Sequence, residues 1–110
     1  MGERRSGARV LSKDLPEILK RFKVDLGTGE LLISTTVDAN ERGISLSVPI
    51  HIYKVKNYNI TLYSMDDSIK ITDELVYVKG LTPEKSRISI MFSSSSSGLE
   101  KYLELLKTAI

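Results

Sequence analysis

Five consecutive serines, Ser93–Ser97, separate an alternating apolar segment from an amphipathic one, a setting in which hydroxyls can bind an anion or act as nucleophiles. A phosphate loop needs glycines and a lysine at fixed spacing, but here only Gly98 follows the run, and the first basic residue after it is Lys101. A nucleophile elbow needs a glycine two residues before the nucleophile, but the residue two before Ser96 is a serine. A solvated connector that ends in the cap of the following helix is therefore the favoured interpretation. Ser95 and Ser96 are kept as candidates for anion binding or phosphorylation, which a helix N-terminus favours.

Tyrosines and lysines are interleaved between residues 53 and 58. Exposed tyrosines can stack on unpaired bases while lysines contact the phosphates. The N-terminal arm adds three arginines, so that the candidate nucleic-acid-binding residues are Arg4, Arg5, Arg9, Tyr53, Lys54, Lys56 and Tyr58. If their strands are neighbours, the surface would extend to Tyr63, Tyr77, Lys79 and Arg87.

The net charge is confined to the N-terminal arm. Three arginines and Glu3 give residues 1–9 the whole formal charge of +2, and 13 basic and 13 acidic side chains remain in residues 10–110. Nucleic-acid-binding domains are typically strongly basic. A neutral body therefore favours a protein partner or a homodimer, with single-stranded nucleic acid as the alternative.

Metal and enzyme sites find little support in the composition. Cysteine is absent and His51 is the only histidine, so a metal site would need carboxylates. The nearest candidates lack calcium-loop spacing and are interpreted as turn residues: Asp66, Asp67, Asp73 and Glu74. Gly27 and Gly29 lead into a strand and not a helix, which indicates a turn and not a dinucleotide site. We expect no metal, no cofactor and no enzymatic activity.

A short N-terminal helix is predicted after the arm. Ser12 or Asp14 can cap it, and Pro16 suits its first turn. Its apolar face would consist of Leu15, Ile18, Leu19 and Phe22.

From residue 24 to residue 92 the apolar period is close to two, which predicts strands separated by turns. The expected strands are 31–37, 44–52, 58–63, 68–72, 75–79 and 87–92. Pro49 cannot donate a backbone hydrogen bond, so it indicates an edge, a bulge or a bend in the second of these. About six antiparallel strands should form a curved sheet or a small barrel.

A C-terminal helix has the clearest start signal. Ser97 and Glu100 form a Ser-x-x-Glu capping box. One apolar stripe follows, made of Leu99, Tyr102, Leu103, Leu106 and Ile110. This helix should pack on the sheet.

The order of these elements, strands and then one capped amphipathic helix, resembles the closing portion of a pleckstrin-homology-like barrel over about residues 43 to 110. The resemblance implies a curved antiparallel sheet with the C-terminal helix packed on it. Tyr102 is the nearest counterpart of the tryptophan common in that family's closing helix. The phosphoinositide-binding basic motif of the family has no counterpart here, so no site residue is carried over.

Length and composition favour one domain. The 110 residues fit a single core, with residues 1–10 as a basic flexible arm and residues 11–110 as one α+β domain. No apolar run approaches the ~20 residues of a membrane span, and no signal peptide is visible, so a cytoplasmic protein is expected. The absence of glutamine, tryptophan and cysteine is typical of thermophiles. The sequence predicts a small non-catalytic binding or adaptor domain that recognises a protein partner or self-associates.

Overall fold

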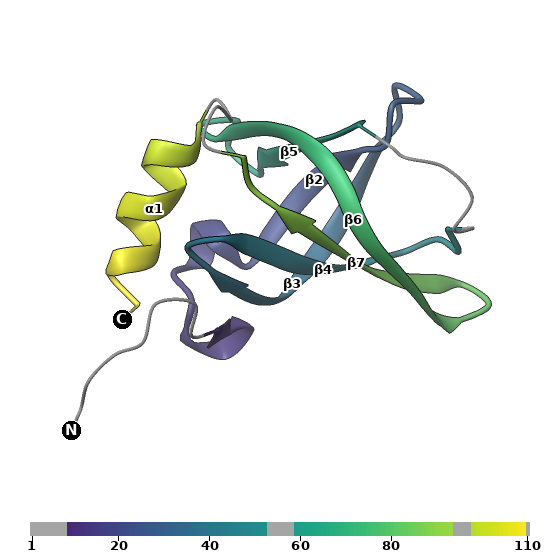
Figure 1. Ribbon diagram of the computed structural model, residues 1–110, viewed down its shortest axis with the longest axis horizontal. Helices are drawn as coiled ribbons and strands as arrows, with labels where there is room; N and C mark the ends of the chain where they lie inside the picture. The colour runs from purple at the N-terminus through teal and green to yellow at the C-terminus, as the bar shows by residue number, and fades with distance from the viewer. Residues whose placement is uncertain (1–8, 53–58, 94–97, 110) are drawn as a thin grey trace.

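A computed structural model describes residues 9–52, 59–93 and 98–109, which form seven strands and one α-helix (Figure 1). The strands are β1 (Val10–Leu11), β2 (Arg21–Asp25), β3 (Leu31–Asn40), β4 (Gly43–Val48), β5 (Asn59–Ser64), β6 (Lys70–Thr82) and β7 (Lys85–Met91). The helix is α1 (Leu99–Lys107), and two short 3-10 turns, Ser12–Asp14 and Glu17–Leu19, precede β2.

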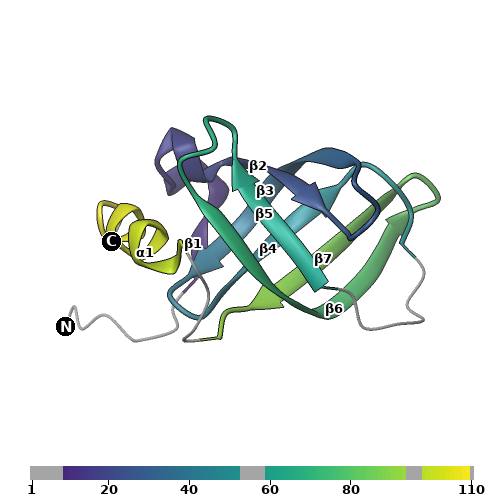
Figure 2. The same cartoon turned by 90° about the horizontal axis from the view of Figure 1, so that it is seen from above.

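The strands form one curled antiparallel sheet (Figure 2). Their order is β1-β3-β2-β5-β6-β7-β4, and β4 also pairs with β3, so the hydrogen-bonded ladder returns to its second strand. The result is a strongly curled sheet with α1 at one end (Figure 1). The expected curved antiparallel sheet with one C-terminal helix is confirmed.

The core lies on the inner face of the curl. Alternate residues of β2, β4, β5 and β7 are buried there: Phe22, Val24, Ile44, Leu46, Ile60, Leu62, Ile88 and Ile90. Burial of side chains of this size contributes roughly 1.5 to 3 kcal/mol each. Tyr102 and Leu106 complete the core from α1.

The predicted N-terminal helix is not seen. Leu15 and Pro16 are extended, with ψ angles of 152° for both, as expected of a proline and of the residue that precedes it. The carbonyl oxygen of Leu19 accepts a 2.6 Å hydrogen bond from the Thr36 hydroxyl, and that of Lys20 accepts one of 2.9 Å from the Thr36 N–H. These carbonyls therefore bind β3 and not a following helical turn. Leu15 and Leu19 are nevertheless buried.

Two strands that the sequence separates at Asp73 and Glu74 are one continuous strand, β6. Asp73 pairs with Ile60 of β5, and Glu74 pairs with Asn59. The Asp73 carboxylate also accepts a 2.7 Å hydrogen bond from the Ser93 N–H. The prediction of a turn at these two residues is wrong, because both lie in the ladder.

The structure contains the predicted turn at Gly27 and Gly29, but the C-terminal helix does not start as predicted. Gly27 and Gly29 do form a turn, with φ of 97° and 88°, and both backbone N–H groups donate to the Asp25 carboxylate. At the start of α1, Gly98 with φ of 81° takes the N-cap position, and Glu100 is the second helical residue. The helix therefore starts one residue later than predicted, and the N-cap residue has no side chain that could form the predicted capping box. Ser97, the other member of that box, lies outside the described residues.

Candidate functional site

Most of the residues that the sequence analysis proposed for binding lie outside the described part of the chain. This holds for Arg4, Arg5, Tyr53, Lys54, Lys56, Tyr58, Ser95 and Ser96. Arg9 lies within it. No role of the other eight is tested by the geometry.

Arg9 forms a charge cluster on the outer face of the sheet. Its guanidinium lies 2.6 Å from the Asp38 carboxylate, whose second oxygen is 3.3 Å from the guanidinium of Arg87 on β7. Asp38 is only 13% exposed, whereas each arginine side chain is more than a third exposed. Arg9 also donates to the Ser45 hydroxyl at 3.4 Å, and Ser45 shares a 2.8 Å hydrogen bond with Ser89. Arg9, at the end of the arm, therefore binds β3 and β4, and the cluster continues to Arg87 of β7.

Three of the four residues proposed to extend a binding surface, Tyr77, Lys79 and Arg87, lie on the neighbouring strands β6 and β7. Lys79 of β6 pairs with Arg87 of β7, and Tyr77 pairs with Ser89. Tyr63 lies apart from them, since it pairs with Lys23 of β2 and Lys70 of β6. The Lys70 ammonium is 5.8 Å from the centre of the Tyr63 ring.

The outer face contains a cross-strand row that the sequence analysis missed. Paired residues in an antiparallel ladder lie on the same face of the sheet. Five successive partners on β2, β3, β4, β7 and β6 are Arg21, Thr35, Ser47, Arg87 and Lys79. Their sequence neighbours Phe22, Thr36, Leu46 and Ile88 are buried in the interior, so the row faces outward.

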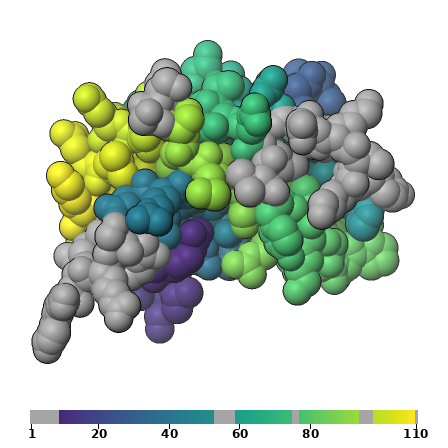
Figure 3. Space-filling view, viewed as in Figure 1, coloured from purple at the N-terminus to yellow at the C-terminus, as the bar shows by residue number. Residues whose placement is uncertain are grey.

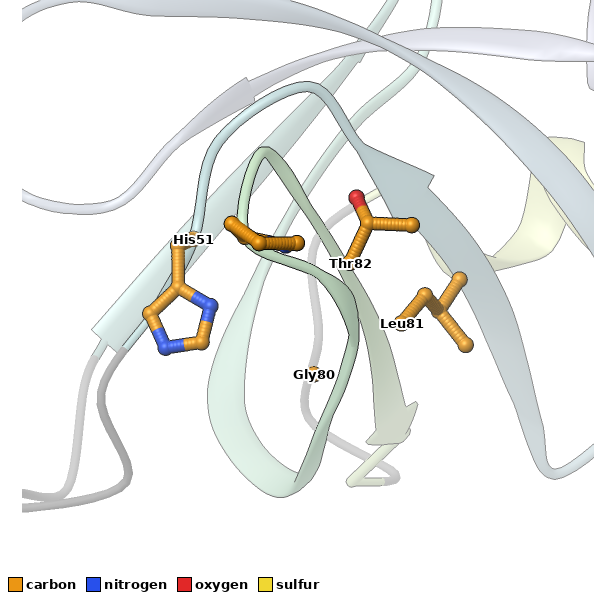
Figure 4. Close-up of a pocket in the computed structure, with 5 residues that line it drawn as sticks. His51, Gly80, Leu81 and Thr82 are labelled. Carbon is orange, nitrogen blue, oxygen red and sulfur yellow. The ribbon is translucent and has the colours of Figure 1, made fainter.

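A pocket of about 470 Å³ lies beside the hairpin that joins β6 and β7. It is lined by His51, Gly80, Leu81, Thr82 and Pro83. Figure 4 shows His51 beside the hairpin from which Gly80, Leu81 and Thr82 come. A side chain on Gly80 would meet the His51 ring at 3.2 Å, so glycine brings the two segments close together.

The chain reaches this pocket by a bend at Pro49. The ladder of β4 ends at Val48, and Pro49 and Ile50 are exposed. Ile52 is buried again, and its N–H donates to the Ser86 hydroxyl at 2.7 Å. The bend is one of the three outcomes expected of Pro49, and it ends the strand four residues earlier than predicted.

A second pocket, of about 380 Å³, lies between the β3–β4 turn and α1. Its lining residues are Glu41, Arg42, Leu103, Leu106 and Lys107. The lining combines charged groups of both signs with two leucines of α1. This pocket belongs to the junction that holds the helix on the sheet.

The acidic turn between β5 and β6 is organised by its own hydroxyls. Hydrogen bonds from the Ser68 hydroxyl at 2.6 Å and from the Ser68 N–H and the Ser64 hydroxyl lower the pKa of Asp66 to about 2. Asp67, with φ of 63°, pairs with Lys23 at 2.6 Å. Both are turn residues, as the sequence indicated. The described part of the chain contains no group of three or more potential metal ligands.

Comparisons with known proteins assign no family. No protein-family model matches this chain, and a search of the curated proteins finds no similar sequence. No helix in the described residues is long and apolar enough to cross a membrane. The function must therefore be argued from the surfaces of this molecule alone.

Proposed function

We propose that this chain is a small non-catalytic binding domain that recognises a protein partner at the end of the sheet opposite α1. The observation that carries the proposal is a set of exposed apolar side chains at that end, Leu31, Ile33, Ile50 and Leu81. In monomeric proteins, apolar side chains gathered at one site are typical of interaction surfaces. We call this set, with the pocket beside it, the hairpin end.

Three separate segments contribute to the hairpin end. Thr35 pairs with Ser47, so the residues before Thr35 and those after Ser47 lead toward the same end of β3 and β4. Ile50 directly precedes His51, which lines the pocket together with Leu81. Figure 1 shows the β6–β7 hairpin at the opposite end of the molecule from α1, and Figure 3 shows the same separation on the surface.

The pocket supports a partner that inserts a side chain. Leu81 and Pro83 contribute apolar atoms to its lining, and His51 and Thr82 contribute polar groups. A concave, largely apolar site with a few polar groups fits one bulky apolar side chain of a partner. In protein interfaces such an anchor is typically surrounded by contacts that exclude water and by a polar rim.

The test compares Leu81→Asp with Met91→Asp. Both leucine and methionine are exposed, at 47% and 58%, but Met91 lies at the far end of β7. Proteins captured from the source cell and identified by mass spectrometry should include one that Leu81→Asp loses and Met91→Asp retains. Sedimentation velocity over a range of concentrations would detect self-association in the same variants. Identical binding by both variants, with a monomer at every concentration, would contradict the proposal.

A further inference from the structure

The cross-strand row on the outer face carries positive charge that the described residues do not neutralise. Arg21 and Lys79, at its two ends, have no ion-pair partner within the ranges that the structure describes. Arg87 shares the carboxylate of Asp38 with Arg9. Within the row and the Arg9 cluster, four cations therefore accompany one carboxylate, that of Asp38, although the body of the chain is neutral. Farther along β2 on the same face, Asp25 adds a carboxylate and Lys23 pairs with Asp67.

Hydroxyl groups fill the space between the cations. Thr35 and Ser47 separate Arg21 from Arg87 in the row, and Thr35 is exposed. Proteins bind phosphate oxygens mainly with arginine and lysine, supplemented by serine and threonine hydroxyls. The row therefore presents the mixture of donors that a phosphate chain needs.

The direction of the row fits an extended ligand. Successive residues lie on adjacent strands, which are about 4.8 Å apart, so Arg21 and Lys79 are separated by roughly 20 Å across the sheet. A linear polyanion that crosses the strands at a right angle would meet a cation at each end of the row and a third at Arg87. A single small anion would contact only part of it.

Tyr77 adds a group that recognises more than charge. It is 46% exposed, and it lies on the same outer face as Lys79, two residues earlier on β6. An exposed aromatic ring beside a line of cations is the arrangement that binds unpaired bases by stacking. We propose that the outer face of β2, β3, β4, β7 and β6 binds single-stranded nucleic acid, with phosphates on the row and a base on Tyr77. The row borders the hairpin end, since Lys79 directly precedes Gly80, but the two surfaces share no residue and are tested with different variants.

The experiment measures binding of the full chain to labelled oligo(dT) and oligo(U) of about 16 nucleotides, the upper end of what one small barrel covers. Each phosphate contact contributes about 0.7 to the slope of log affinity against log salt. Replacing both Arg21 and Lys79 by alanine should therefore reduce the magnitude of the slope by about 1.4. Tyr77→Leu should weaken binding about fivefold or more with little change in the slope.

The control removes the same charge elsewhere. Lys101 and Lys107 are exposed on α1, and replacing both by alanine should leave affinity and slope unchanged. No binding at low salt, or equal loss in both double variants, overturns the proposal. Displacement by poly-glutamate as efficiently as by oligo(dT), with no effect of Tyr77→Leu, overturns it in favour of an acidic protein ligand. Circular dichroism of each variant verifies that these exposed substitutions leave the fold intact.

Discussion

The hydroxyl of Tyr102 on α1 donates a 2.8 Å hydrogen bond to the backbone carbonyl oxygen of Asn40, 62 residues earlier in the chain. A longer contact of 3.3 Å reaches the carbonyl oxygen of Gly43. The tyrosine is fully buried, and its ring meets Phe92 edge-on with centroids 4.9 Å apart. One side chain thus fixes the helix to the β3–β4 turn through both packing and hydrogen bonding.

Tyr102→Phe should lower the free energy of unfolding by about 1 to 3 kcal/mol, because two buried carbonyl groups lose their donor while the packing is kept. Urea denaturation followed by circular dichroism measures the change. Tyr77→Phe removes a hydroxyl from an exposed ring and should change stability by less than about 0.5 kcal/mol. Equal effects of the two substitutions would show that the Tyr102 hydrogen bonds contribute nothing.

The same burial raises the pKa of Tyr102 well above its usual value of 10.0. Because the folded-state pKa is raised, the neutral phenol contributes stability that is fully present below about pH 10. That contribution is lost as the pH rises from the unfolded-state pKa to the folded-state one. The unfolding midpoint of the wild type should therefore fall above pH 10 more steeply than that of Tyr102→Phe, and parallel curves would contradict this.

Ionisation of Asp66 makes the stability depend on pH in the opposite direction, and at low pH. Its pKa is lowered from 3.8 to about 2 in the folded chain, chiefly by the Ser68 hydroxyl. The ionised carboxylate therefore contributes stability above about pH 4, and this contribution disappears as the pH falls through 2. An NMR titration should find that Ser68→Ala raises the Asp66 pKa toward its ordinary value. An unchanged pKa would exclude the Ser68 hydroxyl as its cause.

Gly98→Ala should be strongly destabilising for two separable reasons. The residue has φ of 81°, and a Cβ atom there would lie 2.3 Å from the backbone oxygen of Lys70. Gly29→Ala is the matched control, since φ is 88° and no atom lies within 4 Å of its Cβ position. The control should cost about 1 to 2 kcal/mol from the left-handed backbone alone. Thermal or urea unfolding should find Gly98→Ala clearly worse; similar losses would mean that Lys70 moves away freely.

Asp38→Asn tests the charge balance of the outer face. The substitution keeps the size of the side chain but removes the only carboxylate near Arg9 and Arg87 in the described cluster. Both arginines then become available to phosphates, so affinity for oligo(dT) should increase and its salt dependence should steepen. Fluorescence anisotropy at two salt concentrations measures both. Weaker binding by Asp38→Asn would show that the carboxylate is needed to orient the arginines.

The curved antiparallel sheet and the closing helix could be predicted from the sequence, because their apolar residues recur with clear periods of two and near 3.6. Phe22 was the exception. It was assigned to a helix because Leu15, Ile18, Leu19 and Phe22 also fit helical spacing. Alternation of Arg21, Lys23 and Asp25 with the buried Phe22 and Val24 was a competing signal for β2. Tertiary pairing with β3 and β5 decided between the two.

The candidate site was less accessible to sequence reasoning. Arg21, Ser47 and Lys79 are far apart in the chain, and only the register of four ladders aligns them. Three of these ladders, β2–β3, β3–β4 and β6–β7, join strands that are consecutive in the chain. No local pattern specifies that β4 pairs with β7, which brings the two halves of the row together.

Because β4 pairs with both β3 and β7, the sheet depends on segments that are far apart in the chain. β2 must pair with β5, which places Phe22 opposite Ser64. β4 must pair with β7, which places Gly43 opposite Met91. A chain emerging from the ribosome therefore cannot complete its sheet until β7 has been released. Until then one side of β4 lacks its hydrogen-bonding partner, and an unpaired strand edge can associate with other chains.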